Sequence, residues 1–145
     1  MTQPSSRPSR VLIVEDDPSI SELMRIVLID AGFEPELAAS GKSALERVRV
    51  APPHMLIMDL HLEGNTSVVA LARDIRAAAG RPLPILIASA SHRTDLCEVV
   101  GAYGFVAKPF DVEEFVEAVK RGLSIAAAQV DDTGAFMAGL TSAAA

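Results

Sequence analysis

Short apolar runs that alternate with helical periodicity are the feature that most constrains how this chain folds. Aliphatic runs predict five strands, at residues 11–14, 33–37, 54–58, 83–89 and 104–107. Amphipathic segments predict five helices, at residues 18–31, 40–50, 66–79, 94–101 and 111–128. Because most of the strands are apolar throughout, helices must cover both faces of the sheet, which is typical of parallel strands. The pattern therefore predicts an α/β fold of five strand–helix units with right-handed crossovers.

Prolines, a glycine and apolar stripes refine the predicted positions and faces of these elements. Pro35 has no amide donor, so the second strand is expected at an edge of the sheet. Pro18 suits the first turn of a helix, and Gly32 suits the position just after its end. Two helices carry an apolar stripe that predicts their buried face: Ile20, Leu23, Met24, Val27 and Ala31 in the first, and Val112, Phe115, Val116, Val119 and Leu123 in the last.

The length of the chain predicts a single folded unit. Its 145 residues suit one domain, which we expect at residues 10–125. Residues 1–9 are then a flexible arm, and residues 126–145 are the end of the last helix and a tail. Phe136, Met137 and Leu140 have the spacing of one helical face, so the tail either docks on a protein surface or is disordered.

Charge and cysteine content narrow the classes of partner. A net charge of −6 without a basic block argues against direct nucleic-acid binding. Cys97 is the only cysteine, so one chain can form neither a disulfide nor a thiolate metal site, which fits a reducing cytoplasm. No apolar run approaches the length of a membrane span. We therefore expect a cytoplasmic protein whose direct partners include neither nucleic acid nor membrane.

Polar residues gather at the carboxyl ends of four predicted strands: Glu15, Asp16 and Asp17 after the first, Asp59 after the third, Ser89 at the end of the fourth and Lys108 after the fifth. Ligands of open α/β sheets bind at this edge. Clustered carboxylates repel one another unless a cation neutralises them, and a set of oxygen ligands favours Mg²⁺. Lys108 then suits a phosphate oxygen, Ser89 can hydrogen-bond another, and Asp59 is left as a candidate nucleophile.

Four segments resemble one known family in their order and near its spacing: "VLIVEDDP", "LIMDLHLEG", "ILIASA" and "GFVAKPF". The family is the receiver domain of bacterial two-component response regulators, and the resemblance covers roughly residues 10–125. It implies a doubly wound, flavodoxin-like (βα)5 fold with five parallel strands in the order 2-1-3-4-5. It also implies a switch protein, not an enzyme, whose only catalysis is its own phosphotransfer and autodephosphorylation.

The resemblance implies the phosphoacceptor and the metal ligands. Asp59 matches the aspartate that accepts the phosphoryl group. Glu15 and Asp16 match the acidic pair that holds Mg²⁺ (Mn²⁺ is the alternative metal), together with Asp59 and the backbone carbonyl of His61. Asp17 follows that pair directly and ranks below it as a ligand.

The resemblance also implies how the phosphate is sensed. Lys108 matches the phosphate-binding lysine, and its peptide bond to Pro109 is expected to be cis. Ser89 matches the hydroxyl residue that reports the phosphate, and Phe105 matches the aromatic residue whose rotamer couples to it. Both Ser89 and Phe105 are therefore predicted switch residues, and Lys108 and Ser89 join Asp59 in the predicted reaction.

The resemblance implies partners of two kinds. The phosphodonor is a histidine kinase or a histidine phosphotransferase. The output is a downstream protein that binds the face formed by the fourth helix, fifth strand and fifth helix, a face through which receivers also form homodimers. Because few residues follow residue 125, the chain is interpreted as a stand-alone response regulator of a phosphorelay.

Two alternatives to this interpretation stay open. One is a degenerate receiver that acts as a phosphorylation-independent protein-binding module. The other is a phosphatase with Asp59 as its nucleophile, although His61 stands where haloacid-dehalogenase-type enzymes need a second aspartate.

Several positions depart from the family pattern. His54 stands where the family usually has aspartate, and Glu63 and residues 66–67 replace its usual proline and Asp-Gly. The segment before Lys108 is short, which predicts a truncated fourth helix. His61 and Ser91 match positions that border the phosphoryl group, and each either tunes its hydrolysis or has a plain surface role.

Overall fold

The computed structural model describes residues 7–62, 67–91 and 93–144, with side chains described as far as residue 129. Strands and helices alternate in this order: β1 Arg10–Val14, α1 Pro18–Asp30, β2 Glu34–Ala38, α2 Gly41–Val50, β3 Met55–Met58, α3 Val68–Ala79, β4 Ile85–Ser89, α4 Thr94–Val100, β5 Gly104–Ala107 and α5 Val112–Ala144. The strands form one sheet in the order β2-β1-β3-β4-β5, and every neighbouring pair is parallel. The predicted doubly wound fold and the edge position of the second strand are confirmed.

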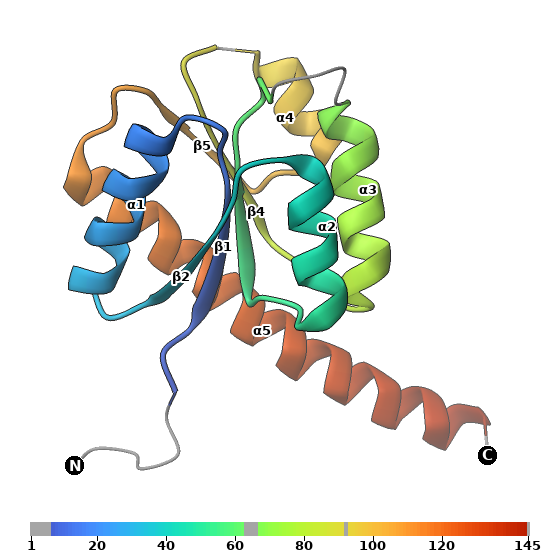
Figure 1. The fold of residues 1–145 in the computed structure, drawn as a ribbon. Helices are drawn as coiled ribbons and strands as arrows, with labels where there is room; N and C mark the ends of the chain where they lie inside the picture. The colour runs from blue at the N-terminus through green and yellow to red at the C-terminus, as the bar shows by residue number, and fades with distance from the viewer. Residues whose placement is uncertain (1–6, 63–66, 92, 145) are drawn as a thin grey trace, which may run out of the picture.

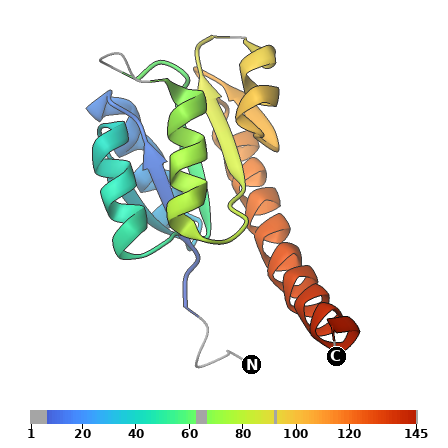
Figure 2. The same ribbon diagram turned by 90° about the vertical axis from the view of Figure 1, so that its right-hand side faces the viewer.

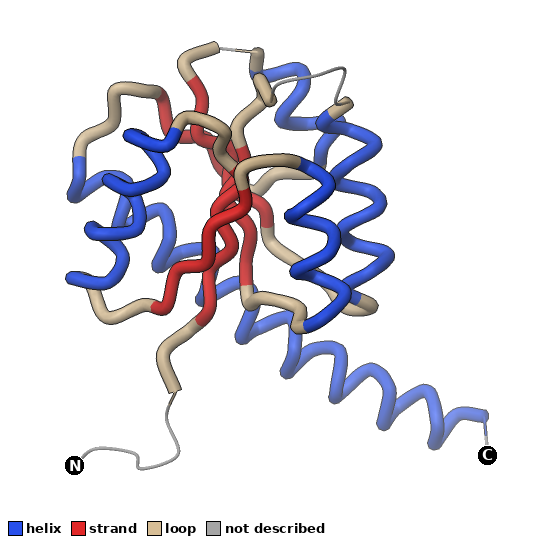
Figure 3. The backbone as a smooth tube through the Cα atoms, in the orientation of Figure 1, coloured by secondary structure: helices blue, strands red, loops and turns tan. Residues whose placement is uncertain are grey.

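The helices form two layers, one on each face of the sheet (Figures 1 and 2). α1 and α5 cover one face, and α2, α3 and α4 cover the other, with the strands between them (Figure 3). Alternate residues of a strand point to opposite faces. Leu12 and Leu56 therefore enter the core on the α2–α3 side, whereas their neighbours Ile13 and Ile57 enter the core on the α1–α5 side. Each face of the central strands is thus fully buried.

Local capping sets several helix ends. The Asp17 carboxylate accepts hydrogen bonds from two amides of the first turn of α1, that of Ser19 at 2.8 Å and that of Ile20 at 3.3 Å. Ser40 forms a capping box at the start of α2. Gly80 ends α3 with a φ of 66°, a left-handed conformation that glycine adopts without strain. These contacts fix where α1 and α2 begin and where α3 ends.

For two residues of the predicted apolar stripes, the expected burial is wrong. Leu23 of α1 and Val112 of α5 are each 48% exposed. The buried side of α1 is formed by Met24 and Leu28, one turn apart, and Leu23 lies about 100° around the helix from Met24. Val112 begins α5, and the buried residues of that helix start one turn later at Phe115. Both side chains therefore belong to the surface.

The last helix is longer than predicted. α5 continues to Ala144, beyond the expected end at residue 128, because its alanine-rich continuation contains no proline to stop it. Figures 1 and 2 show this part projecting away from the sheet. The expected boundary at residue 125 falls inside the helix. Residues 1–6 of the expected arm, and the side chains of Phe136, Met137 and Leu140, lie outside what the structure describes. Among the described helices, none combines the length and the apolar character that crossing a membrane requires.

His54 joins the starts of β1 and β3. Its Nδ1 accepts a hydrogen bond from the Arg10 backbone amide at 2.8 Å, and its own amide donates to the Arg10 carbonyl at 2.9 Å. Because Nδ1 accepts a hydrogen bond, it carries no proton, and the neutral ring is protonated at Nε2. Burial and the positive charges of Arg81 and Arg10 lower the pKa of His54, which favours this neutral form.

This contact predicts a pH dependence of stability. Since the pKa of His54 is lowered in the folded protein, its protonation favours the unfolded chain. The stabilisation is complete above the unfolded histidine pKa of about 6.5 and is lost as the pH falls through the lower folded value. His54→Asn keeps an acceptor for the Arg10 amide but does not titrate. We expect the urea midpoint of the wild type to fall more steeply below about pH 6.5 than that of His54→Asn. Equal pH dependence in the two proteins would contradict the assignment.

Candidate functional site

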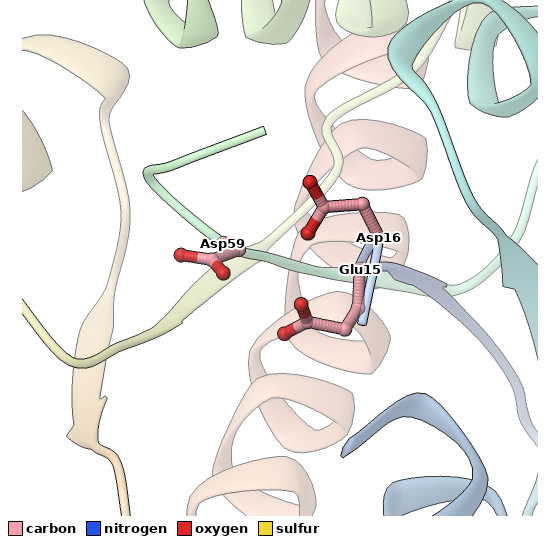
Figure 4. A group of neighbouring side chains, drawn as sticks. All are labelled: Glu15, Asp16 and Asp59. Carbon is pink, nitrogen blue, oxygen red and sulfur yellow. The ribbon is translucent and has the colours of Figure 1, made fainter. Parts of the chain in front are cut away.

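The carboxyl ends of the parallel strands bring the predicted acids together. Glu15 and Asp16 follow β1, and Asp59 follows β3. The Asp59 amide donates a hydrogen bond to the carbonyl of Val14, the last residue of β1, at 3.2 Å, so the two strand ends lie side by side. Each of the three acids offers an oxygen that lies within 4.8 Å of the others. Figure 4 shows the three carboxylates projecting from the two strand ends into the same region. The structure therefore places these acids as the sequence predicted.

Lys108, which follows β5, contacts two of these carboxylates. Its Nζ donates to Asp59 Oδ2 at 2.9 Å and also to Glu15 Oε1. The backbone amide of Lys108 donates to the Ser89 carbonyl at 3.0 Å, which fixes the start of the loop after β5. The Lys108–Pro109 peptide bond is cis. The side chains of Lys108 and Asp59 are each only 9% exposed, so the ion pair is largely shielded from water.

Burial and the lysine set the charges of this cluster. Burial raises the pKa of Asp59, but hydrogen bonds from Lys108 and from the His61 amide outweigh it, and the pKa falls below its usual value. Burial likewise opposes the charge of Lys108, and the two carboxylates outweigh it and raise its pKa. For Glu15 burial prevails over the lysine, and the pKa is raised. Asp59 is therefore an ionised carboxylate held beside a protonated lysine.

The predicted sensing residues surround Asp59. Ser89 is fully buried, and its hydroxyl accepts a hydrogen bond from the Ser91 amide at 3.2 Å. A hydrogen bond with Ser89 also helps to lower the pKa of Asp59. The His61 amide donates to Asp59 Oδ1 at 3.0 Å, while its side chain is exposed. Phe105 is partly buried and packs against the core on the α2–α4 side.

The structure also tests the predictions made for Asp17, the fourth helix and the loop after Asp59. Asp17 lies outside the acidic cluster, since its carboxylate caps α1. The fourth helix is short, as predicted, with the seven residues Thr94–Val100. Glu63 and Thr66 lie outside the described residues, and Ser67 is the N-cap of α3.

An apolar hollow beside Lys108 is a feature that sequence reasoning misses. Besides Lys108 it is lined by Ile20, Leu23, Ala90, Pro109 and Phe110. These residues come from α1, the loop after β4 and the loop after β5, so no single segment signals the hollow. Leu23 is the one apolar residue whose exposure could have indicated the hollow, but its helical spacing alone predicts that it is buried in the core.

Comparison with known proteins identifies the family and the fold of the chain. The family model of the response regulator receiver domain matches residues 11–120. The chain belongs to this family. The receiver domain is 37% identical over 119 residues to the DNA-binding response regulator MtrA of Mycolicibacterium smegmatis, a match that covers 79% of this chain and 50% of MtrA. It thus spans about half the length of the curated relatives that it matches.

Solved structures agree with this assignment. A putative response regulator from Chloroflexus aurantiacus has a TM-score of 0.72 and 34% identity, covering 81% of this receiver and 99% of that chain. Chemotaxis protein CheY4 of Vibrio cholerae has a TM-score of 0.72 and 28% identity, covering 80% of this receiver and 99% of that chain. Both likenesses extend over the receiver fold.

The acidic cluster fits the Mg²⁺ that receiver domains bind at such a pocket. Its donors are carboxylate oxygens, which Mg²⁺ prefers. Three of them lie close together, and Lys108 forms ion pairs with two, Glu15 and Asp59. A divalent cation at this cluster would offset the mutual repulsion of these carboxylates. Glu15, Asp16 and Asp59 are therefore the residues that would hold it.

A metal titration tests this cluster. Binding to the folded state alone adds about 2.7 kcal/mol of stability at a concentration 100 times Kd, so Mg²⁺ should raise Tm measurably. Asp16→Asn removes one ligand and should weaken the Mg²⁺ affinity about 10-fold or more. Asp30→Asn, which alters an exposed acid at the end of α1, is the matched control and should keep the full response. Thermal unfolding followed by circular dichroism measures both. An Mg²⁺ response of Asp16→Asn equal to that of the control would contradict the assignment.

Proposed function

We propose that this receiver is a phosphorylation switch that accepts a phosphoryl group on Asp59 from a histidine kinase or a histidine phosphotransferase. The observation that carries the proposal is the buried, ionised Asp59 carboxylate with Lys108 Nζ 2.9 Å from its Oδ2. A carboxylate in this state is a nucleophile, and the lysine beside it is a cation suited to a phosphate oxygen.

The transfer forms one bond and breaks another. An Asp59 carboxylate oxygen attacks the phosphorus of a phosphohistidine, the N–P bond breaks, and the imidazole nitrogen leaves with the bonding electrons. Lys108 exchanges its contact with the carboxylates for a phosphoryl oxygen, where it offsets the transferred charge. A bound Mg²⁺ supplies further positive charge at the phosphoryl oxygens. Its proposed holders are Glu15, Asp16, Asp59 and the His61 carbonyl, a set of oxygen donors that would also accept Mn²⁺.

The phosphoryl group then changes contacts that lead to the surface. The Ser89 hydroxyl now accepts a hydrogen bond from the Ser91 amide at 3.2 Å, and it would turn from that amide towards a phosphoryl oxygen. Phe105 would repack on β5, next to α4. These shifts bias two arrangements of the α4–β5–α5 face, and a downstream protein or a second copy of the chain binds one of them.

The hollow beside Lys108 supports a protein as phosphodonor. It is lined largely by apolar side chains, among them Leu23 of α1, and the same helix exposes two further apolar side chains, Ile26 and Ile29. Because Lys108 both lines this hollow and contacts Asp59, a donor that presents a phosphohistidine to Asp59 would come close to the hollow and could bury its own apolar side chains there. Exposed apolar patches of this kind mark sites of protein contact.

The proposal includes limits on the protein's activity. It acts as a cytoplasmic regulator, with no turnover beyond its own phosphotransfer and dephosphorylation. MtrA is named as a DNA-binding regulator, but the net charge of −6 here favours output through proteins. The rival function is a degenerate receiver that binds partners without phosphorylation. The intact Lys108–Asp59 pair argues against it, since a degenerate site would not need this buried charge arrangement.

Mass measurement tests the phosphoacceptor. We expect the wild type, incubated with Mg²⁺ and acetyl phosphate or a phosphorylated kinase, to gain the mass of one phosphoryl group. Asp59→Ala should gain none, because the nucleophile is lost. Asp74→Ala, which alters an exposed aspartate on α3, should react as the wild type does. The proposal fails if the wild type gains no phosphoryl mass or if Asp59→Ala gains it equally.

A further inference from the structure

A second cavity lies at the opposite edge of the sheet from Asp59. It has a volume of about 440 Å³ and opens between the starts of β1, β3 and β4 and the helix α5. This volume is within the range of about 300–1,000 Å³ that is usual for small-molecule sites. We propose that this cavity binds a small amphipathic carboxylate, a molecule that joins one carboxylate group to a short hydrocarbon chain.

Hydrogen-bond donors form the polar side of the cavity. His54 lines it, and because its Nδ1 already accepts the Arg10 amide, the ring nitrogen that remains is the protonated Nε2, a donor. Arg81 lines it as well, and its Nη2 donates to the carbonyls of Pro52 at 3.1 Å and Pro53 at 2.9 Å. Those two bonds orient the guanidinium, and within the described residues its other N–H groups donate to no further acceptor, so they can bind one. The polar side therefore calls for an acceptor-only group.

Charge favours an anion as that group. Within the described part of the chain, no carboxylate forms an ion pair with Arg81, whereas the neighbouring Arg10 is paired with Glu36 at 2.9 Å. A guanidinium presents its N–H groups as a planar fork that matches the two oxygens of a carboxylate. The positive charge of Arg81 is thus the one at this cavity that a bound carboxylate would neutralise.

The cavity also has apolar lining. It includes Leu123, Ala126 and Ala127 of α5, whereas His54 and Arg81 precede β3 and β4. Acetate or inorganic phosphate would satisfy the donors but leave this apolar lining in contact with water. A hydrocarbon chain attached to the carboxylate covers the apolar lining and gains about 25 cal/mol per Å² of apolar surface buried. The donors and the apolar lining together therefore select an amphipathic carboxylate.

Titration with hexanoate, followed by two-dimensional ¹H–¹⁵N NMR of the full chain, tests the cavity. We expect saturable shifts of the Leu123, Ala126 and Ala127 amides with hexanoate, and none with hexanol or acetate at the same concentrations. Arg81→Gln should weaken hexanoate binding at least about tenfold, since a hydrogen-bonded charge is lost. Arg73→Gln, which alters an exposed arginine on α3, is the matched control and should bind as the wild type does.

A second variant, Ala127→Glu, tests the cavity independently in case Arg81→Gln does not fold. Ala127 is an exposed residue of α5, and glutamate is well tolerated in helices, so Ala127→Glu should fold. It places a negative charge on the apolar lining of the cavity and should therefore abolish hexanoate binding. Asp59→Ala should bind hexanoate normally, so this test stands apart from phosphorylation. The proposal is overturned if hexanoate gives no saturable shifts, if hexanol binds equally well, or if either folded cavity variant binds hexanoate as tightly as the wild type.

Discussion

The ion pair of Lys108 with Asp59 and Glu15 is the interaction on which the rest of the site depends. Parallel strands deliver carboxylates to one edge of the sheet, where burial and mutual repulsion disfavour their charge. Lys108 reaches them from β5 and offsets that charge. Removing one partner of a buried pair typically costs about 3–5 kcal/mol, because the other charge is left uncompensated. The same lysine is thus a structural counterion before phosphorylation and, as we propose, a phosphate ligand afterwards.

Much of this arrangement follows from the order of residues along the chain. Asp59 and Lys108 each follow an apolar run, and a parallel sheet places all such positions at one edge. That rule needs only the strands, which apolar runs reveal directly. Pro35 likewise indicates an edge strand, because proline has no backbone N–H to donate to a second neighbouring strand.

Other features depend on contacts that the order of residues does not show. An acid before a helix serves equally well as a cap or as a ligand, and only the fold shows that Asp17 caps α1. Leu23 fits an apolar stripe by spacing, yet the rotation of α1 on the sheet turns it to the surface. The hollow beside Lys108 and the cavity beside Arg81 each combine three or more separate segments. Neither could be predicted before those segments were placed together.

The two ends of the sheet differ in their chemistry. The carboxyl edge gathers acids around one lysine and suits a metal and a phosphoryl group. The amino edge has a cavity lined by donors, His54 and Arg81, and by apolar residues of α5. His54 therefore has a physical role where the family usually has aspartate, since it joins β1 to β3 and lines the cavity. α5 extends beyond the sheet from this second edge, so a ligand there would contact the helix at the point where it leaves the domain.

A crystal structure with Mg²⁺ and beryllofluoride, a phosphoryl analogue, most directly tests the proposed role of the ion pair. We predict beryllium bonded to an Asp59 carboxylate oxygen, with Lys108 Nζ moved from Glu15 to a fluoride and the Ser89 hydroxyl turned towards another. An analogue bound at any other residue would contradict this mechanism. So would an unmodified Asp59 with Lys108 still bridging it to Glu15.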